Sequence, residues 1–279
     1  MKQVYNTALR IRHVVVDSGI EQTNELQSRK MMTSFQEKER IRQEAFNGIW
    51  DTKINDVFSD VASVYDRAND FASLGTLKGL RRRFIDTIDV EPGQRVLDVC
   101  AGTNVIGIEL LKKQPKLDVY AVDRSDAMQE VGKDRAAKQG FKINKNIGDV
   151  HTLPFPDNHF DVVTLQYATR HLRVIDVFSE ISRVLKPGGH FYHCDMLRPA
   201  NKLVEESYYL YLKACLKMTS WAIRSSPVAV SCHQYFVDAI RLYYSTEELS
   251  QLLHELGYSN VIGKSMLGGT VGFHKACKA

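Results

Sequence analysis

The chain has 279 residues, a length that suits one large α/β domain with additions or two small domains. Its 44% hydrophobic and 25% charged residues are ordinary for a globular protein. The formal net charge of +4 is too mild to indicate a nucleic-acid partner, although it suits an anionic membrane surface.

The cysteines and the apolar runs limit the class of protein further. The five cysteines are scattered and form no CxxC pair, so neither a disulfide framework nor a zinc site is indicated. We therefore expect a reducing compartment. No apolar run has the length of a membrane span. The first residues lack the continuous apolar core of a secretory signal.

The first 52 residues are polar and show no strand pattern. Residues 1–16 contain three Lys or Arg and no acid, a bias that fits a mitochondrial transit peptide, with a plain arm as the alternative. The segment from Glu21 to Glu44 is rich in Gln, Glu, Lys and Arg and predicts a solvated helix or a partly disordered arm. We assign residues 1–52 to an N-terminal arm or targeting segment and residues 53–279 to the main domain.

Residues 53–88 predict two amphipathic helices, because their apolar residues recur at helical spacing. The second helix carries a basic face, Arg81-Arg82-Arg83. From about residue 94 short apolar runs alternate with helical segments, which predicts a parallel sheet with helices on both faces. The predicted strands are Arg95–Cys100, Asp118–Val122, Asn144–Ile147, Asp161–Leu165 and His190–Cys194, and the predicted helices are Ile106–Lys113, Ser125–Gln139 and Val174–Leu185.

The last third of the chain has a different pattern. Residues 199–250 predict a long aromatic-rich helical stretch that interrupts the sheet and can serve as a lid. A helix from Thr246 to Leu256 follows, with Thr246 as the expected N-cap and Gly257 as its end. Two late strands, Asn260–Ser265 and Thr270–Lys275, are close enough to pair as a hairpin. Before this region, Lys186-Pro187-Gly188-Gly189 is expected to stop a helix ahead of a strand.

The segment Val96–Asn104 predicts a strand, a tight turn of small residues and a helix start. Such turns let the backbone approach a ligand, and the helix N-terminus favours polar or anionic groups. Asp98 ends the strand and is placed to hold a cofactor's ammonium group. Gly102 supplies the close approach. A glycine is expected where Asn104 stands, but asparagine tolerates a positive φ better than other residues.

Two further carboxylates end the next two predicted strands. Asp123 lies about 20 residues beyond the small-residue turn, where an acid can accept both hydroxyls of a ribose. Asp149 is placed to accept an adenine amine, and Val150 follows it. For each acid the alternative is an ordinary turn or loop role. The series of three acids is what favours a nucleotide cofactor.

The carboxyl ends of the fourth and fifth strands are where reacting groups should lie, because ligands bind beyond that edge of such sheets. Four candidates for a base or an electrostatic role occur there: Arg170, His171, His193 and Asp195. Arg is a poor base at neutral pH, so Arg170 is expected to stabilise charge. A single histidine is more often structural than catalytic.

Motifs spread over four-fifths of the chain occur together in one known family. They are the opening pattern Val57-Phe58, Val61-Ala62, Tyr65-Asp66 and Asn69-Asp70; the turn Val96-Leu97-Asp98 with Gly102-Thr103; Leu153-Pro154-Phe155-Pro156-Asp157 and Phe160-Asp161; and the segment Arg183 to Gly189. With these residues the chain resembles the ubiquinone/menaquinone C-methyltransferases, a class I S-adenosylmethionine-dependent family, from about Val57 to the C-terminus.

The resemblance implies a Rossmann-like seven-stranded methyltransferase sheet, parallel with a C-terminal antiparallel strand. N-terminal helices and a helical lid insertion over about 199–245 complete this expected fold. The implied reaction transfers a methyl group from S-adenosylmethionine to a ring carbon of a polyprenylated benzoquinol or naphthoquinol. The residues implied for the cofactor pocket are Tyr65, Asp98, Gly102, Thr103, Asp123, Asp149 and Val150, and those implied for catalysis are Arg170 and His171.

The resemblance also implies partners and a location. A polyprenyl quinol as substrate implies peripheral membrane contact, with Arg81-Arg82-Arg83 meeting anionic headgroups. The aromatic segment Tyr208–Trp221 is a candidate groove for the tail, with helix core as the alternative. A homodimer or a quinone-biosynthesis complex is the expected assembly, on the cytoplasmic or mitochondrial matrix side of a membrane.

The chain departs from the family pattern at both sites. The family's Gly-Thr-Gly-Asp turn is Gly102-Thr103-Asn104-Val105 here, which removes one polar partner of the cofactor. The family's Phe-Gly-aliphatic-Arg-Asn segment is Tyr167-Ala168-Thr169-Arg170-His171. Two alternatives therefore stay open: a methyltransferase acting on another small molecule, and a non-catalytic paralogue with a structural role in a quinone-biosynthesis complex.

Overall fold

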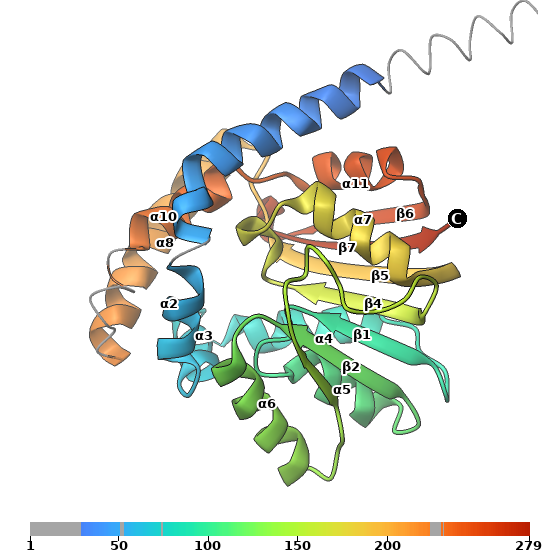
Figure 1. Ribbon diagram of the computed structural model, residues 1–279. Coiled ribbons are helices and arrows are strands. Elements are labelled where there is room, and N and C mark those ends of the chain that lie inside the picture. Colours follow the sequence, from blue (N-terminus) through green and yellow to red (C-terminus); the bar gives the residue numbers. More distant parts are fainter. Residues whose placement is uncertain (1–28, 51–52, 74, 224–229, 231) are drawn as a thin grey trace, which may run out of the picture.

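The computed structural model describes residues 29–50, 53–73, 75–223, 230 and 232–279 (Figure 1). Seven strands form one sheet in the order β3-β2-β1-β4-β5-β7-β6. Strands β1 to β5 pair in parallel, and β7 runs antiparallel to both of its neighbours. The predicted α/β architecture is confirmed. The strands are β1 Arg95–Val99, β2 Asp118–Asp123, β3 Asn144–Ile147, β4 Phe160–Gln166, β5 Leu185–Met196, β6 Tyr258–Met266 and β7 Val271–Lys278.

Helices cover both faces of the sheet because its central strands are apolar on both sides. Neighbouring residues of β1, Val96 and Leu97, point to opposite faces, and both are fully buried. Val96 packs with α4 and α5, whereas Leu97 packs with α7 and α11. The helices are α2 Ile54–Val61, α3 Tyr65–Ala72, α4 Thr76–Thr87, α5 Val105–Lys113, α6 Asp126–Lys138, α7 Val174–Val184, α8 Lys202–Ile223, α10 His233–Arg241 and α11 Thr246–Glu255, with short 3-10 turns η1 Thr169–His171 and η2 Leu267–Gly269.

Two predicted element ends are wrong. Helix α11 is capped by Ser245 and not by Thr246: the Ser245 hydroxyl accepts the Glu248 N–H, and the Glu248 carboxylate accepts the Ser245 N–H. This reciprocal pair satisfies two N–H groups at the start of the helix. The segment 186–189 does not separate a helix from a strand, because α7 ends at Val184 and β5 already begins at Leu185. Its glycines form an irregular start of β5.

Residues 29–50 form a helix that runs across the molecule beside α10 (Figure 1). One face of this helix is buried: Phe35 packs in the main core, and Phe46 and Trp50 pack with Tyr235 of α10. The described part of the predicted arm is thus a helix fixed to the domain. The targeting segment predicted for the first residues lies outside the described residues. The boundary at residue 52 stays a prediction.

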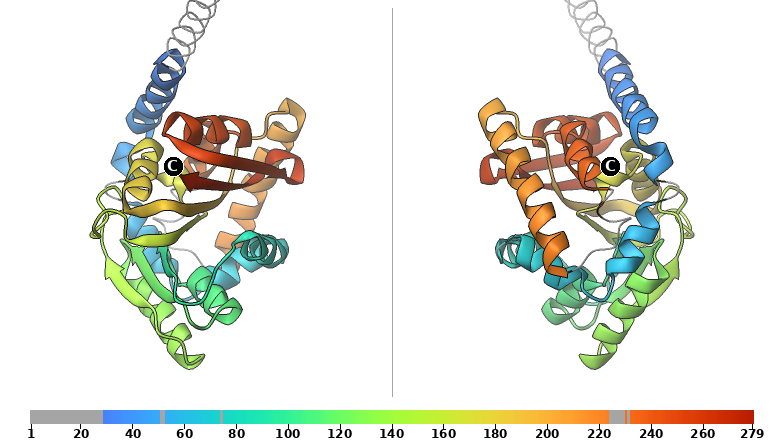
Figure 2. Two further views of the ribbon diagram at one scale, coloured as in Figure 1. Left: turned by 90° about the vertical axis from the view of Figure 1, so that its right-hand side faces the viewer. Right: turned by 90° about the vertical axis from the view of Figure 1, so that its left-hand side faces the viewer.

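Helices α2, α3, α8 and α10 gather beyond the carboxyl ends of the parallel strands (Figures 1 and 2). Helix α8 is the predicted aromatic-rich stretch, and its two faces differ. Tyr209 is buried and packs with Val237 and Ile240 of α10, whereas Leu210 and Trp221 are exposed. Helix core, the alternative foreseen for this segment, thus describes its inner face, and the groove for the tail stays a prediction. None of the described helices has the length and hydropathy of a membrane span.

Candidate active site

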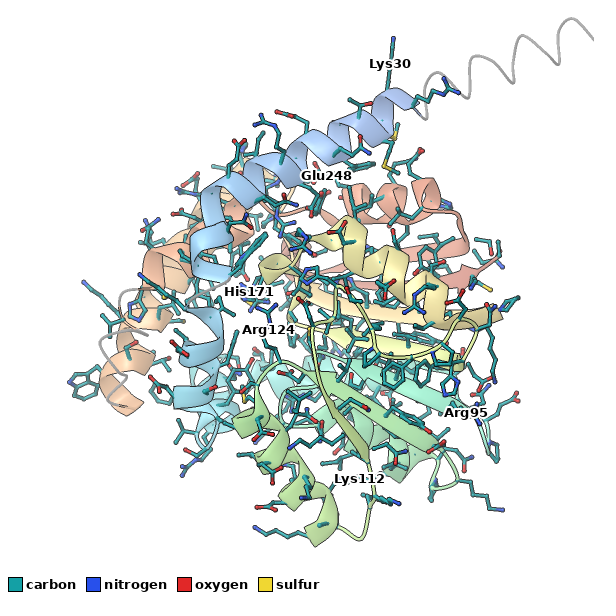
Figure 3. All side chains as sticks on the ribbon, viewed as in Figure 1. Lys30, Arg95, Lys112, Arg124, His171 and Glu248 are labelled. Atoms are coloured by element: carbon teal, nitrogen blue, oxygen red, sulfur yellow. The ribbon has the colours of Figure 1, made fainter. Side chains whose placement is uncertain are left out.

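A cavity opens where the carboxyl ends of β1, β2 and β4 meet α2, α3 and α4. All seven residues expected at the cofactor line it, and so does His171. Arg170 does not line it. Figure 3 labels His171 and Arg124 at this cavity, on the connections that follow β4 and β2. The lining residues used below are Tyr65, Arg81, Asp98, Gly102, Thr103, Asp123, Asp149, Val150, Gln166, Tyr167 and His171.

The turn after β1 has a left-handed backbone at three positions. φ is 54° at Cys100, 52° at Gly102 and 56° at Asn104. The expectation that asparagine keeps the turn where a glycine is usual is confirmed, because Asn104 is in the left-handed region and starts α5 as its N-cap. Asparagine is enriched there among non-glycine residues.

The residues around the Asn104 side chain accommodate it. It is buried, and its Oδ1 accepts a hydrogen bond of 3.0 Å from Gln129 Nε2, which also donates to the Gly102 carbonyl at 2.9 Å. Helix α6 passes at Gly132, where an added Cβ would lie 2.7 Å from Asn104 Nδ2 and 2.8 Å from the Thr103 carbonyl carbon. Gly132 therefore makes the room that the larger side chain needs.

Thr103 fastens the turn to two helices. Its hydroxyl donates to Asp66 Oδ2 of α3 at 3.0 Å and accepts from Arg135 Nη1 of α6 at 3.1 Å. Arg135 and Asp66 also form an ion pair of 2.5 Å. The Thr103 side chain is thus committed to positioning the turn at the cavity.

Asp98 is the clearest candidate for a ligand contact, because one of its carboxylate oxygens is unpaired. Its Oδ1 accepts from the Thr164 hydroxyl at 2.7 Å, whereas its buried Oδ2 has no hydrogen-bond partner in the described structure. Burial raises its pKa to about 7, with the Thr164 bond acting against this rise. An unpaired carboxylate oxygen facing a cavity fits a cationic donor. The ammonium of S-adenosylmethionine is such a group, so the residues present fit the expected cofactor.

Asp123 holds the turn from the side of β2. Its Oδ2 accepts the Gly102 N–H and its Oδ1 accepts the Ser125 N–H, both at 2.8 Å. Burial raises its pKa, and these backbone bonds act in the opposite direction. Each carboxylate oxygen has a second lone pair, so the bonds still leave acceptors for a vicinal diol.

Asp149 lies half-exposed at the rim, between the side chains of Arg124 and His151. Its Oδ2 pairs with Arg124 Nη2 at 3.0 Å, and its Oδ1 is 2.6 Å from His151 Nδ1. Burial acts to raise its pKa, but the His151 bonds and the Arg124 charge outweigh it and lower the pKa to about 2. Val150, the next residue, is buried and offers an apolar wall.

Arg170 lies just behind the cavity wall. Its Nη1 pairs with the fully buried Asp195 at 2.6 Å and donates to the Tyr167 carbonyl at 2.8 Å. Burial acts against its charge, but Asp195 outweighs burial, so the pKa of Arg170 is raised. Arg170 therefore stays cationic, and its charge acts on Tyr65, whose pKa burial raises and Arg170 lowers.

His171 presents an unpaired ring nitrogen to the cavity. Its Nδ1 is hydrogen-bonded to the Tyr235 hydroxyl, and its buried Nε2 has no partner among the described residues. Burial, together with Arg170 and Arg42, lowers its pKa well below the ordinary value, so the ring is neutral. Trp50 Nε1–H already donates to the Tyr235 oxygen at 2.9 Å. When the Tyr235 hydroxyl in turn donates to Nδ1, the ring hydrogen of His171 lies on Nε2.

The other two candidates, His193 and Asp195, make contacts that hold the structure together. His193 is fully buried between the Thr169 hydroxyl and His274, at 2.9 Å and 3.2 Å, and does not line the cavity. Asp195 accepts the Thr169 N–H at 2.8 Å as well as the Arg170 pair, so it fixes η1. Neither residue lines the cavity, and the contacts of both fit the structural alternative.

Most of the other lining residues were not expected from the sequence as site residues. Arg81, Gln166 and Tyr167 are three of these that have a buried polar atom without a hydrogen-bond partner among the described residues. Gln166 and Tyr167 directly follow the predicted fourth strand, so their place in the chain was a usable signal. The sequence offers no such signal for Arg81, because it stands beside two other arginines and reads as part of the basic face of its helix. Only Arg82 and Arg83 of that face are exposed.

The strand order, the cavity at the carboxyl ends of the strands and the family match define the class: a Rossmann-like S-adenosylmethionine-dependent methyltransferase. Solved structures support the fold. An S-adenosylmethionine-dependent methyltransferase from Aquifex aeolicus aligns with a TM-score of 0.51 at 19% identity, over 71% of this chain and 89% of that one. Phosphoethanolamine N-methyltransferase 2 of Haemonchus contortus, solved with S-adenosylmethionine, aligns with a TM-score of 0.53 at 17% identity, over 72% of this chain and 52% of that one.

The chain belongs to the ubiE/COQ5 methyltransferase family, which it matches over residues 47–278. Among its relatives is the ubiquinone/menaquinone biosynthesis C-methyltransferase UbiE of Ectopseudomonas mendocina, 32% identical over 81% of this chain and 89% of the relative. The UbiE of Azotobacter vinelandii is 32% identical over 81% of this chain and 90% of the relative. The protein is therefore an S-adenosylmethionine-dependent methyltransferase.

Proposed function

We propose that the enzyme methylates a ring carbon of a polyprenylated benzoquinol or naphthoquinol in ubiquinone or menaquinone biosynthesis. The names of its relatives support this acceptor, since they are C-methyltransferases of ubiquinone and menaquinone biosynthesis and align over most of their length. The observation that carries the proposal is the neutral His171 ring, with its unpaired Nε2, beside the buried Arg170 charge. Together they favour an oxyanion on the acceptor.

The cofactor half of the cavity is built by the turn after β1 and by the ends of β2 and β3. Asp98 would take the ammonium, Asp123 the ribose hydroxyls and Asp149 the adenine amine, with Val150 against the ring. When bound, S-adenosylmethionine supplies a methyl group already activated on a sulfonium sulfur. The protein's task is then to orient the acceptor and to make its carbon nucleophilic.

A quinol carbon becomes nucleophilic when the neighbouring hydroxyl ionises. His171 Nε2–H can donate a hydrogen bond to that oxygen, which strengthens as negative charge grows. Arg170 stabilises the same charge through the wall without acting as a base. The hydroxyl proton leaves to water. After the new carbon–carbon bond has formed, the ring carbon gives its own proton to water and the ring oxygen takes a proton back, which restores the aromatic quinol with a net release of one proton.

The most informative test in the cell is the quinone profile of a strain that lacks this chain. Loss of the enzyme should accumulate a demethylated quinone with an intact polyprenyl tail, and the wild-type chain should restore the normal quinone. A chain with Asp98→Asn should not restore it. An unchanged quinone profile, with a different methylated metabolite missing, would favour another small-molecule acceptor. Restoration by Asp98→Asn would favour a structural role.

A further inference from the structure

Asp195 is a fully buried carboxylate whose two oxygens accept four hydrogen bonds. Its Oδ2 accepts the backbone N–H and the side-chain hydroxyl of Thr169, at 2.8 Å and 2.5 Å. Its Oδ1 accepts Arg170 Nη1 at 2.6 Å and the Met196 N–H at 2.7 Å. An ionised carboxylate has about four lone-pair sites, so these donors saturate it. Three of the four belong to η1, the turn that carries Arg170 and His171.

Arg170 is held through one of its nitrogens. Nη1 donates both to Asp195 and to the Tyr167 carbonyl, and in the described part of the chain Nε and Nη2 form no hydrogen bond. An arginine and a carboxylate often pair through two parallel hydrogen bonds. Here the Thr169 hydroxyl occupies the lone pair that a second Arg170 nitrogen would need. The hydroxyl therefore limits the pair to one hydrogen bond.

His193 fixes the direction of the Thr169 hydroxyl. The hydroxyl oxygen lies 2.9 Å from His193 Nε2, and the carboxylate can only accept, so the single hydroxyl hydrogen goes to Asp195. The hydrogen that joins the ring to Thr169 is then carried by His193 Nε2. Burial and the neighbouring His274 lower the pKa of His193 well below its ordinary value, so the ring is neutral. These two bonds hold the hydroxyl between the ring and the carboxylate.

The charge of Arg170 acts on groups beyond its ion pair. Burial raises the pKa of Tyr65, Tyr208 and Tyr235, and the Arg170 charge acts against the rise in each case. These tyrosines belong to α3, α8 and α10, and Tyr65 lines the cavity. A second hydrogen bond to Asp195 would draw the guanidinium toward β5 and weaken its field at the cavity.

We propose that Thr169, held by His193, is a positioning residue for methyl transfer. It withholds one Asp195 oxygen from Arg170, so the cation keeps the orientation in which it stabilises an oxyanion on the acceptor. This role rests on the proposed function, in which Arg170 acts on the acceptor oxygen. Thr169 itself lies outside the lining of the cavity and acts only through Asp195 and Arg170.

Crystal structures test the pairing without any acceptor. Thr169→Val removes the hydroxyl and keeps the shape of the side chain, so two Arg170 nitrogens should bind Asp195 in this variant, whereas Thr169→Ser should keep one. The matched control is Thr246→Val, because Thr246 is also buried and its hydroxyl has no partner among the described residues. It should leave the pair unchanged. A pair through Nη1 alone in Thr169→Val would overturn the proposal.

A second variant covers the case in which Thr169→Val does not fold. The single substitution leaves His193 Nε2–H buried without an acceptor, which is costly, whereas replacing both partners by apolar groups of similar shape is nearly neutral. Thr169→Val combined with His193→Phe should therefore fold. It should show the same two-nitrogen pair, and a one-nitrogen pair in this variant would also overturn the proposal.

Kinetics with the quinol acceptor test the consequence for catalysis. Thr169→Val should lower kcat by about 10- to 100-fold, and Thr169→Ser should recover most of the loss. S-adenosylhomocysteine affinity, measured by calorimetry, should not change, which general damage to the fold would not allow. An unchanged kcat in a variant with the two-nitrogen pair would refute the positioning role and leave the quinol assignment intact. If the wild-type chain methylates neither quinol, the proposed function fails, and the crystal structures still decide the role of Thr169 at Arg170.

Discussion

At the scale of single residues, the turn after β1 shows how a departure from the family pattern is accommodated. Asn104 occupies a left-handed position, Gln129 bonds its side-chain oxygen, and Gly132 gives its amide room. The same Gln129 holds the Gly102 carbonyl. These contacts couple the conformation of the turn to α6, so a substitution on α6 should change the affinity for the cofactor.

Gly132→Ala tests this dependence. The added Cβ would approach both Asn104 and the Thr103 backbone, and overpacking of this kind costs about 1–3 kcal/mol. We expect S-adenosylhomocysteine affinity to fall by about 5- to 100-fold, measured by calorimetry. Asn104→Gly in the same chain should recover part of the loss, because it removes the side-chain contacts and leaves the backbone contact.

The control is Gly79→Ala, a helical glycine whose added Cβ would meet nothing within 4 Å. It should leave the affinity unchanged. If Gly132→Ala binds the ligand as the wild type does, or if Asn104→Gly recovers nothing, the contact between α6 and the turn does not set cofactor affinity.

Asp98 makes cofactor binding depend on pH. Its pKa of about 7 in the free protein means that it must lose a proton to accept an ammonium group. We expect S-adenosylhomocysteine affinity to be steady above pH 7 and to fall by about tenfold per unit below it. Asp98→Asn should bind weakly at every pH. A wild-type affinity that does not change between pH 5 and pH 8 would contradict this role.

The same raised pKa predicts an opposite effect on stability. Folding hinders ionisation of Asp98, so the penalty is absent below the ordinary pKa of 3.8, grows with pH, and is complete above about 7. The ligand-free Asp98→Asn variant should therefore gain thermal stability relative to the wild type as pH rises from 5 to 8. Asp98 thus lowers the stability of the ligand-free protein while it favours cofactor binding.

The position of some site residues could be predicted from the sequence, and that of others could not. Asp98, Asp123 and Asp149 end strands, so their order along the chain places them at one edge. Arg81 could not be found this way, because which side of a basic helix faces inward depends on packing. Nor could the sequence show that Arg170 lies behind the wall, since its orientation is set by Asp195 on the neighbouring strand.

At the scale of elements, the helix over residues 29–50 holds the connection that carries Arg170 and His171. Arg42 is fully buried, and its Nη2 donates to the carbonyls of Arg170 at 3.0 Å and Leu172 at 3.2 Å. Glu39 pairs with Arg42, and its Oε2 accepts the Val174 N–H at 2.7 Å at the start of α7. Both residues precede the part of the chain that matches the family.

Arg42→Met tests this support. Removing one partner of a buried ion pair costs about 3–5 kcal/mol, because the other charge is left unpaired. We expect lower stability toward denaturant and faster hydrogen exchange of the amides from 169 to 174. The control is Arg40→Met, since Arg40 lies on the exposed face with Glu37 and its loss should change stability little. Equal effects of the two substitutions would contradict the role given to Arg42.

The regular elements could be predicted because apolar periodicity and turn residues are local signals. Strand β3 agrees with its predicted range, and α5 and α7 agree to within one residue. The buried face of the helix over residues 29–50 could not be predicted. Its apolar residues are loosely spaced, and its main anchor is a buried arginine, which a sequence pattern assigns to the surface.

At the scale of the whole molecule, the outer face of α8 is the surface best suited to a lipid substrate. Leu203, Leu210 and Trp221 are 82%, 72% and 84% exposed and recur at helical spacing. Lys213 and Lys217 lie exposed on the same helix. An apolar stripe beside basic residues is typical of a helix that lies on an anionic membrane, so we propose that this face meets the bilayer.

Vesicle sedimentation tests this contact. Leu210→Ser with Trp221→Ala should lower binding to vesicles that contain anionic lipid by about tenfold or more, because each side chain contributes about 1.5–3 kcal/mol when buried. The control is Ile147→Ser, an exposed apolar residue on the edge strand β3. Unaltered binding of the α8 variant would contradict a membrane contact through this face.

The proposed function requires that the enzyme transfers methyl groups from S-adenosylmethionine to a quinol carbon. Its most direct test is to incubate the purified chain with S-adenosylmethionine labelled in the methyl group with deuterium, and with reduced demethyl-benzoquinol or demethyl-naphthoquinol carrying a short prenyl tail. Mass spectrometry should show a trideuteriomethyl group on a ring carbon of one quinol, and none with Asp98→Asn. Label on oxygen, or no transfer to either quinol by a chain that binds S-adenosylhomocysteine, would contradict the account.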